Sequence, residues 1–445
     1  MNFLPNIIFI VLLVTTSVVF GIRVKKIRRN ILLGRDENRS DRKGERFEQM
    51  FKVAIGQSKM TRKPLSGALH IIVYVGFVII NIEVLEIVID GVLGTHRIFA
   101  DFLGSIYDFL IGSFEILALG VLLACVVFLA RRLSKRIKRF DGIEMTAWPK
   151  SDANIILIVE IALMTAFLVM NAADEQLQSI HAEGYIAAGF YPISGWLSSL
   201  MGMFEASTLI VIERSCWWFH IIGILGFLNY LPFSKHFHIL LAFPNVFYAK
   251  LTPKGQFNNL ESVRKEVELM MDPNVDPYAT PPEADPNAAL PAPFGAKDIQ
   301  DLSWKSIMDS YTCTECGRCT EDCPANQTGK LLSPRKIMMD VRDRAEELGR
   351  LIDKSGKEAT DNKSLLNDYI TPEELWACTS CNACVDSCPV NNDPLAVIVD
   401  LRRYLVMEQS QAPNELNIMF GNVENNGAPW AFPAADRFNW ASEED

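Results

Sequence analysis

Two twelve-residue stretches, CTECGRCTEDCP at residues 313–324 and CTSCNACVDSCP at residues 378–389, decide how this 445-residue chain is interpreted. Both follow the spacing CxxCxxCxxxCP without a mismatch. In such a run, three closely spaced thiolates bind three corners of one [4Fe–4S] cubane. The fourth cysteine, which precedes proline, ligates the cubane of the other run. The two motifs therefore predict two [4Fe–4S] clusters.

The predicted ligand sets cross between the motifs. One set is Cys313, Cys316, Cys319 and Cys388, and the other is Cys378, Cys381, Cys384 and Cys323. Structural zinc also uses paired CxxC elements, but it does not explain two complete iron–sulfur runs. Helical patterns at residues 333–353, 372–377 and 394–408 surround the motifs, so the clusters are predicted to lie in a mainly helical domain.

The charge distribution divides the chain into a basic and an acidic part. Residues 1–250 carry a net charge of +5 and residues 251–445 a net charge of −15. An acidic soluble part argues against a nucleic-acid partner, because phosphates require a basic face. Eight of the ten cysteines belong to the motifs, which is typical of metal ligation in a reducing compartment. Cys125 and Cys216 are interpreted as packing residues.

Five apolar stretches are long enough to cross a hydrocarbon core about 30 Å thick. They lie at residues 3–22, 69–89, 106–130, 154–170 and 209–230. The first has no basic residue before it and no clear cleavage site after it, so we expect a retained helix rather than a signal peptide. Residues 191–204 are predicted to form an interfacial helix. The expected fold is mainly α, a five-helix transmembrane bundle followed by a helical ferredoxin domain.

Basic residues orient the predicted bundle. Residues 23–63 hold 14 Lys and Arg and residues 131–150 hold 7, whereas residues 172–207 hold none. Because basic loops stay in the cytoplasm, the N-terminus is predicted outside and the cysteine motifs inside. The expected location is the cytoplasmic membrane of a prokaryote, with several membrane passes.

Histidines in the apolar part are candidate haem ligands. His70 and His238 are predicted at matching depth near the cytoplasmic side. His220 and His238 are eighteen residues apart, which is five turns and about 27 Å on a continuous helix, although Pro232 interrupts the run. The remaining histidines fit an interfacial polar residue equally well: His96, His181 and His236.

Acidic residues on the second predicted crossing share one helix face. Glu83, Glu86 and Asp90 are spaced three, four and seven residues apart and lie toward the outside. One hypothesis is a proton path that serves a quinol site. The alternative is a structural network with Arg97 and Arg214.

The histidine pattern resembles the gamma subunit of respiratory nitrate reductase and the related membrane subunit of heterodisulfide reductase. In these proteins four histidines on two helices hold two haems b. On this resemblance, His220 and His238 correspond to the ligands of the last helix and His70 to the first ligand of the second helix. The fourth position is Ile80 in this chain. Either His220 pairs with a histidine of an outer loop, or the chain holds one haem on His70 and His238.

The cysteine part resembles the dicluster ferredoxin subunit of heterodisulfide reductase. The domain order is similar to the membrane-bound iron–sulfur oxidoreductases of the heterodisulfide reductase type. It implies a cytochrome b-like membrane domain at residues 1–250, then an amphipathic helix and a proline-rich linker at 251–298. A dicluster domain at 299–410 and a C-terminal docking tail at 411–445 follow. In longer relatives the tail leads into a cysteine-rich catalytic domain.

Together these features predict a membrane-anchored electron-transfer subunit. It would pass electrons between quinone or menaquinone, haem b and two [4Fe–4S] clusters, with the substrate site on a cytoplasmic partner. That partner is expected to be a cysteine-rich iron–sulfur subunit or a flavoprotein. The alternatives are a haem-free quinone-binding anchor, a component of an electron-transfer-flavoprotein:quinone oxidoreductase, or a redox sensor that does not turn over.

Overall fold

The computed structural model describes residues 3–134, 137–253, 255–274, 293–357 and 359–442. This part of the chain is mainly helical and contains no β-strand. Five helices are long and apolar enough to cross a membrane. They are α1 (Leu4–Ile31), α3 (Pro64–Leu93), α5 (Ser105–Leu133), α6 (Ala147–Ser179) and α8 (Ala206–Tyr230). All five predicted crossings are thus confirmed as helices, and the fourth, predicted from only 17 residues, lies in the longest of them.

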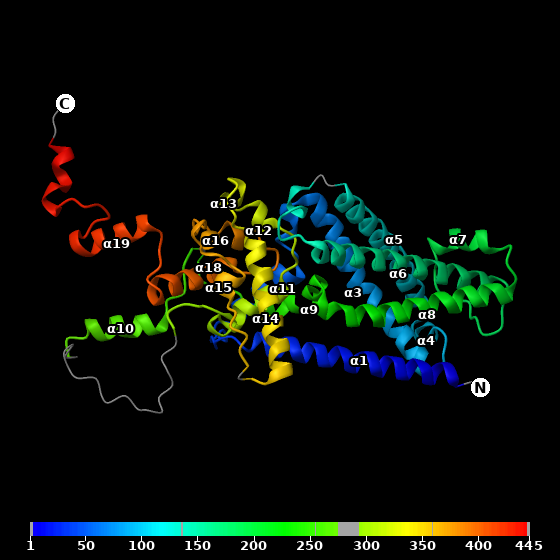
Figure 1. The fold of residues 1–445 in the computed structure, drawn as a ribbon. Helices are drawn as coiled ribbons and strands as arrows, with labels where there is room; N and C mark the ends of the chain where they lie inside the picture. The colour runs from blue at the N-terminus through cyan, green and yellow to red at the C-terminus, as the bar shows by residue number, and fades with distance from the viewer. Residues whose placement is uncertain (1–2, 135–136, 254, 275–292, 358, 443–445) are drawn as a thin grey trace.

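The five helices close into a ring. Going around it, α3 packs on α5, α5 on α6, α6 on α8, α8 on α1, and α1 on α3. Figure 1 shows them running side by side, with the N-terminus at one end of the bundle. The short helix α7 (Ser194–Met201) packs on α6 and occupies the predicted interfacial segment, and α4 (Ile98–Leu103) joins α3 to α5.

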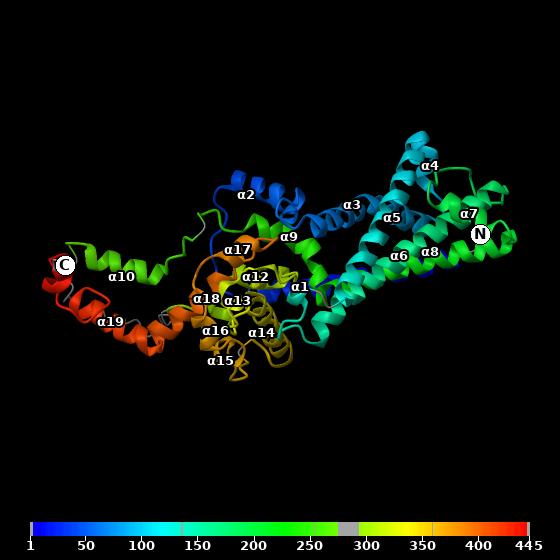
Figure 2. The ribbon, with the colours of Figure 1, turned by 90° about the horizontal axis from the view of Figure 1, so that it is seen from above.

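The cysteine-containing domain covers one end of this bundle (Figures 1 and 2). We call that end the proximal end and the opposite one the distal end. The longer helices of the domain are α11 (Trp304–Thr312), α14 (Pro334–Ser355) and α18 (Pro394–Arg403). Around the motifs lie α12 (Arg318–Glu321), α13 (Pro324–Gln327), α15 (Leu365–Asp368), α16 (Pro372–Trp376) and α17 (Ala383–Ser387).

Local sequence explains where these helices begin. The Ser333 side chain accepts a hydrogen bond from the Lys336 amide at the start of α14, and Pro334 follows at the first helical position. Thr371 and Glu374 form a reciprocal capping box at the start of α16. The helices predicted at 333–353, 372–377 and 394–408 are therefore confirmed, the last ending in a π-helical turn at Tyr404–Glu408.

One hydrophobic core joins the bundle to the cysteine domain. Ile27 and Ile31 of α1, with Leu231 and Phe237, belong to the same buried cluster as the core of the cysteine domain. The first helix continues nine residues beyond the predicted end at residue 22, and its last turns carry these contacts. Asn30 donates to the Tyr311 hydroxyl at 3.0 Å, and Lys26 pairs with Asp353 at 2.7 Å. The cysteine domain is thus packed onto the bundle rather than tethered to it.

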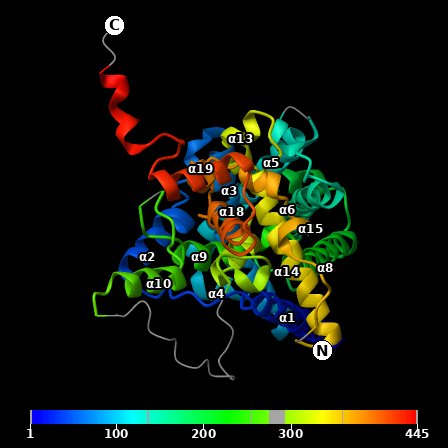
Figure 3. The same cartoon turned by 60° about the vertical axis from the view of Figure 1, so that its left-hand side comes forward.

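Two segments extend away from this body. They are α10 (Glu261–Met271), predicted as an amphipathic helix, and α19 (Asn414–Asn426), followed by the 3-10 helix η8 (Ala434–Ala441). Figures 1 and 3 show both beyond the cysteine domain on the side away from the bundle. Most of the predicted linker, residues 275–292, lies outside the described residues.

Candidate functional site

The two cysteine motifs fold into loops of the same conformation. We call residues 313–319 the first cysteine loop and residues 378–384 the second. In each loop the residues two and four places after the first cysteine have positive φ: Glu315 (51°) and Gly317 (72°), then Ser380 (56°) and Asn382 (60°). A short helix follows in both cases, α12 and α17. This repeated left-handed winding turns successive thiols toward the same side.

Gly317 is required by space as well as by conformation. A Cβ atom at this position would lie 2.5 Å from Nη1 of Arg335, a buried side chain. Arg335 Nη1 donates to the Arg139 carbonyl oxygen at 2.6 Å and its Nη2 pairs with Glu144 at 2.6 Å. Glu144 and Arg139 belong to the segment between α5 and α6, so the first cysteine loop is clamped against a connection of the bundle.

The eight motif thiols lie in two groups. Cys319 interacts electrostatically with Cys313, Cys316 and Cys388. In the second group Cys384 interacts with Cys378 and Cys323, and Cys378 also interacts with Cys381. The structure therefore brings together the residues of each predicted ligand set. Cys319 also interacts with Cys384, so the two groups adjoin.

Burial and backbone amides set the environment of the motif thiols. Burial raises the pKa of the Cys313 thiol to about 12 and that of Cys388 to about 11, so both are protonated thiols near neutral pH unless a cation binds. Backbone amides of Ser380 and Asn392 donate to the sulfur atoms of Cys378 (3.4 Å) and Cys388 (3.2 Å), as amides do around iron–sulfur clusters. These donor sets fit two cubanes.

No three His, Cys, Asp or Glu side chains among the described residues converge on one point as ligands of a single metal ion would. A cubane does not need this convergence, because its four thiolates bind four different irons.

The two loops differ in their surroundings. Cys313, Glu315 and Arg318 of the first loop are 8%, 5% and 6% exposed, and they lie under the proximal end of the bundle. Cys381 of the second loop is exposed. The first thiol group therefore contains two buried and two partly buried thiols next to the bundle, and the second reaches the surface at Cys381.

The histidine segment does not form the continuous helix on which the 27 Å separation rests. Helix α8 ends at Tyr230, two 3-10 turns follow (Leu231–Phe233 and Lys235–Phe237), and His238 begins α9 (His238–Phe247). Pro232 has no amide hydrogen and its ring would clash with the preceding turn, so the helix breaks there. His220 and His238 therefore do not lie on one continuous helix, and the separation of about 27 Å does not apply.

The break brings three histidines together at the proximal end of the bundle. His70, on the first turns of α3, interacts electrostatically with His238 and His236. The rings of His236 and His238 are 5.6 Å apart, nearly perpendicular to each other. The structure thus brings together the predicted pair, His70 and His238, and adds His236 to it.

Hydrogen bonds orient two of the candidate ligands. Nδ1 of His238 lies 2.9 Å from the Lys235 carbonyl oxygen, and Nδ1 of His220 lies 3.1 Å from that of Leu163. A ring held at Nδ1 by a carbonyl presents Nε2, the nitrogen that axial haem ligands use. Nδ1 of His70 is buried without a hydrogen-bond partner. This donor set fits an imidazole-ligated haem at the proximal end.

His220 stands apart from these residues. It is buried in α8 next to Phe167, with the two rings 5.9 Å apart. Ile80 of α3 is buried in the hydrophobic cluster that also contains Trp217 and Ile221 of α8, so α3 presents an apolar side chain there. His96 lies beside Asp174 and Tyr185, and His181 is exposed, so the described contacts do not join either one to His220.

An ion-pair chain connects the histidine segment to the first cysteine loop. Lys235, directly before His236, pairs with Glu315 at 2.5 Å. Glu315 lies between Cys313 and Cys316 and also pairs with Arg342 at 2.7 Å. Burial opposes ionisation of Glu315, but Arg342 and Lys235 outweigh it and lower the pKa of the carboxyl group. Lys235 and Glu315 were not predicted from the sequence. Their only signal in the sequence is position: Glu315 directly precedes Cys316, and Lys235 lies three residues before His238.

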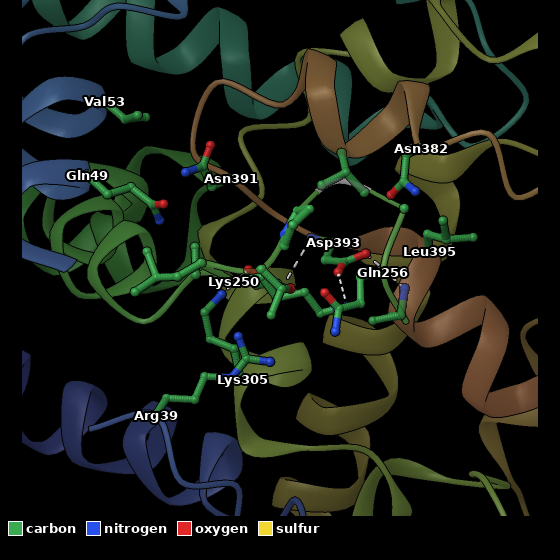
Figure 4. A pocket seen from close by; sticks show the side chains of 18 of the residues that line it. Arg39, Gln49, Val53, Lys250, Gln256, Lys305, Asn382, Asn391, Asp393 and Leu395 are labelled. Atoms are coloured by element: carbon green, nitrogen blue, oxygen red, sulfur yellow. Dashed lines mark hydrogen bonds and ion pairs between the residues drawn. The ribbon is translucent and has the colours of Figure 1, made fainter. Parts of the chain in front are cut away.

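A pocket of about 660 Å³ lies on another side of this junction. Figure 4 shows it between the segment after α1, the chain leaving α9, helix α11 and the second motif. Lys250 pairs with Asp393 across it at 2.9 Å, and Asn245 donates to the Val390 carbonyl oxygen at 2.9 Å. These contacts attach the end of the second motif, which includes Cys388, to the proximal end of the bundle.

Comparison with known proteins agrees with this geometry. The profile of the 4Fe–4S dicluster domain matches residues 312–392. Over 98% of its length the chain is 27% identical to a probable iron–sulfur-binding oxidoreductase, FadF, of Bacillus subtilis, covering 61% of that protein. It is 26% identical, also over 98% of its length, to 59% of an EtfAB:quinone oxidoreductase of Syntrophomonas wolfei.

A shorter similarity is to a probable membrane-anchored ferredoxin of Chromohalobacter salexigens, 30% identical over 35% of this chain and 25% of the relative. No solved structure matches the chain. The chain spans about three fifths of the length of the two relatives that it matches from end to end.

The fold and these similarities together indicate the class of protein to which electron-transfer iron–sulfur proteins belong. The protein has iron–sulfur oxidoreductase homologues, a 4Fe–4S dicluster domain and five candidate membrane helices, and these features support an electron-transfer role.

Proposed function

We propose that this chain is a membrane-anchored electron-transfer subunit between the quinone pool and a cytoplasmic redox partner. Haem b and two [4Fe–4S] clusters supply the one-electron carriers when bound. The main observation that supports this proposal is the Lys235–Glu315 ion pair. It joins the histidine segment of the bundle to the first cysteine loop. The protein's own contribution is to fix these two ligand-bearing segments relative to each other.

The cysteines of each group are the proposed cluster ligands. Cys313, Cys316, Cys319 and Cys388 would hold the cluster next to the bundle, and Cys378, Cys381, Cys384 and Cys323 the cluster nearer the surface. Among the histidines, His70 and His238 would hold a haem at the proximal end. His220 would serve a second haem if one is bound.

The order of the two clusters follows from burial. The first cysteine loop is enclosed under the bundle, whereas Cys381 of the second is exposed. Electrons would therefore exchange between the bundle and the first cluster, and between the second cluster and the partner. In the proposed orientation the bundle spans the cytoplasmic membrane of a prokaryote, with its proximal end and the cysteine domain facing the cytoplasm.

The partner is proposed from the relatives. One relative is described as an EtfAB:quinone oxidoreductase, which favours an electron-transfer flavoprotein as the electron donor. Shorter similarities to subunits of heterodisulfide reductases favour a cysteine-rich iron–sulfur subunit instead. Isolation of the complex with its co-purifying subunit distinguishes these two partners.

The optical spectrum of the purified chain tests the haem. Reduction by dithionite should produce the α and Soret bands of haem b. A spectrum that shows only iron–sulfur absorption would leave a haem-free quinone-binding anchor.

Paired cysteine variants test the electron order. Menadiol, a soluble hydroquinone, is added to the purified chain in lipid nanodiscs, and cluster reduction is followed by electron paramagnetic resonance. The Cys381→Ala variant should retain menadiol reduction of the first cluster. The Cys316→Ala variant should lose menadiol reduction of the second, while dithionite still reduces it. If menadiol reduces the second cluster of Cys316→Ala at the wild-type rate, the proposed order is wrong.

A further inference from the structure

A buried polar network fills the distal end of the bundle, opposite the cysteine domain. Its members come from α3, α5, α6 and the turn after α3, and each of them exposes less than a tenth of its surface. They are Glu83, Glu86, Asp90, Arg97, Tyr107, Glu115, Asn171 and Asp174. Ionisable groups at such positions in a membrane bundle are costly and call for a functional explanation.

Arg97 is the centre of the network. Its guanidinium group donates to Asp174 Oδ2 at 2.5 Å, to the Tyr107 hydroxyl at 3.0 Å and to Asn171 Oδ1 at 3.0 Å. Tyr107 in turn donates to Glu86 Oε2 at 2.9 Å, and the Arg97 amide donates to Asp90 at 2.8 Å. One cation therefore organises side chains from three membrane helices.

The number of carboxyl groups exceeds what Arg97 can neutralise. Five acidic side chains belong to the network together with a single guanidinium group, so full ionisation would leave a net charge of −4 in a medium of low dielectric constant. Backbone amides also donate hydrogen bonds to three of them, Glu86, Asp90 and Glu115. The network therefore places several carboxyl groups that can take up or release a proton close together.

Among the described residues, Glu83 is the acidic side chain of the network with the fewest hydrogen bonds and with no cation closer than 4.0 Å. It is 3% exposed, its Oε1 atom is 4.0 Å from Arg97 Nη1, and its Oε2 atom is buried without a hydrogen-bond partner. It lies ten residues before the end of α3, which is about 15 Å of helix. Glu83 thus lies at the inner edge of the network, at about the depth of Glu115 on α5, and has one oxygen available to a further proton donor or acceptor.

The outer end reaches the surface through His96. Nε2 of this residue is 3.6 Å from Asp174 Oδ1, and its side chain is 21% exposed. The His96 ring stacks edge-on against Tyr185, whose hydroxyl donates to Glu213 of α8 at 3.1 Å. Polar side chains therefore extend from Arg97 and Asp174 to the distal surface next to the Glu213–Arg214 ion pair, and the 3.6 Å step between Asp174 and His96 is longer than a hydrogen bond.

We propose that this network is a proton-transfer route, with Glu83 as its inner terminal group and His96 as its exit. The inference rests on the proposed quinone chemistry and extends it to named residues. Oxidation of one hydroquinone breaks two O–H bonds and yields the quinone, two electrons and two protons. The electrons go to the carriers of the chain, and each proton is taken up by the Glu83 carboxylate and released on the distal side by way of the polar groups around Arg97 and His96. Quinone reduction would use the same route inward.

A purely structural network makes a different prediction. In that case the acidic side chains only hold α3, α5 and α6 together around Arg97. Removing the charge of Glu83, the carboxyl group without a close partner, would then change neither quinol oxidation nor proton release.

The test compares Glu83→Gln with Glu160→Gln. Glu160 is a carboxyl residue of α6 for which the described structure shows no hydrogen bond or ion pair with the network, so it is the matched control. Both variants and the wild type are placed in nanodiscs, and cluster reduction by menadiol and by dithionite is followed. We expect Glu83→Gln to slow menadiol-driven reduction by about a hundredfold or more, the scale of a lost general base, and to leave reduction by dithionite unchanged. Glu160→Gln should match the wild type in both assays.

Infrared spectroscopy supplies a readout that does not depend on turnover. The redox difference spectrum of the wild type should contain a carbonyl band of a protonated carboxyl group, which Glu83→Gln lacks and Glu160→Gln retains. If Glu83→Gln fails to fold, His96→Asn tests the exit, with slower proton release into a pH-indicator solution as the expected result.

Different results would contradict the proposed quinone function and the proposed proton route. If menadiol reduces no cluster in the wild type, the proposed quinone function is wrong. If menadiol reduces the wild type and Glu83→Gln at the same rate and their carboxyl bands are identical, the proton route alone is overturned.

Discussion

At Gly317 both the backbone conformation and the close packing require glycine. Its φ of 72° favours glycine, and a Cβ atom there would collide with Arg335. Gly329 offers a matched control, since its φ is 84° but no atom would lie within 4 Å of a Cβ atom at that position. Gly329→Ala should therefore cost only the left-handed conformation, about 1 kcal/mol.

Gly317→Ala should lower the free energy of unfolding by more than Gly329→Ala does, because the buried Arg335 side chain must move. We expect the purified Gly317→Ala chain to lose iron and labile sulfide, with the signal of the first cluster reduced most. Equal iron contents in the two alanine variants would show that Arg335 can move aside without weakening the binding of the first cluster.

Glu315 supplies the second prediction at this scale. Glu315→Gln removes one negative charge beside Cys313 and Cys316 and leaves Lys235 and Arg342 unpaired. An elementary charge roughly 8 Å from a redox centre contributes on the order of 2 kcal/mol at an effective dielectric constant of 20. Losing a negative charge favours the reduced cluster, so its potential should rise by roughly tens of millivolts.

An electron paramagnetic resonance redox titration measures this shift. Glu321→Gln is the control, because Glu321 lies in α12, directly after the same loop, but its side chain is 40% exposed and pairs with Lys63 at the surface. Shifts of the same size in both variants would contradict a special role for the enclosed carboxylate.

At the scale of elements, the break after α8 decides which histidines meet. Pro232→Ala restores an amide hydrogen and removes the ring clash, so α8 should continue and carry His236 and His238 away from His70. A proline in a helix interior costs about 3 kcal/mol, which is the penalty that the substitution relieves. We expect loss of the haem b absorbance bands with little loss of the iron–sulfur signals.

Pro244→Ala provides the control for this experiment. Pro244 lies inside α9, beyond the histidines, and α9 is already helical around it. Unchanged absorbance bands in both variants would show that the break does not position a haem.

Element boundaries could be predicted only where the sequence changes character. The apolar stretches end at charged residues, so the five crossings were identified, but α1 continues through the basic residues after Ile22 because α11 and α14 pack against it. The interruption at Pro232 was visible in the sequence. Its consequence, the approach of His236 to His238 and His70, depends on how the next two turns fold.

At the scale of the whole molecule, the C-terminal tail is separate from the shared core. No described residue of α19 is buried, and large apolar side chains after it are exposed, including Phe438 (75%) and Trp440 (74%). Deleting residues 414–445 should therefore leave the iron content and the Tm of the chain unchanged, and abolish its association with the partner subunit.

A pull-down with the partner and a thermal melt of the truncated chain check these two outcomes together. Loss of iron on truncation would mean that the tail supports the clusters. Undiminished binding would place the docking surface elsewhere, with the exposed loop around Cys381 as the next candidate.

The sequence by itself determined the five apolar helices and the helical cysteine domain, and it predicts the two cysteine ligand sets. These features depend on local patterns: apolar stretches of sufficient length, fixed cysteine spacing and residues that begin or break helices. Periodicity and spacing are properties of neighbouring residues, so a single chain is enough to show them.

Only the tertiary structure decided which group lies under the bundle and how the distal acidic residues are connected. Lys235 and Glu315 are 80 residues apart, and Arg97 and Asp174 are 77 residues apart. No local pattern specifies such pairs. They form because burial of the shared core and of the helix ring brings these side chains to the same depth, where an unpaired charge would be costly.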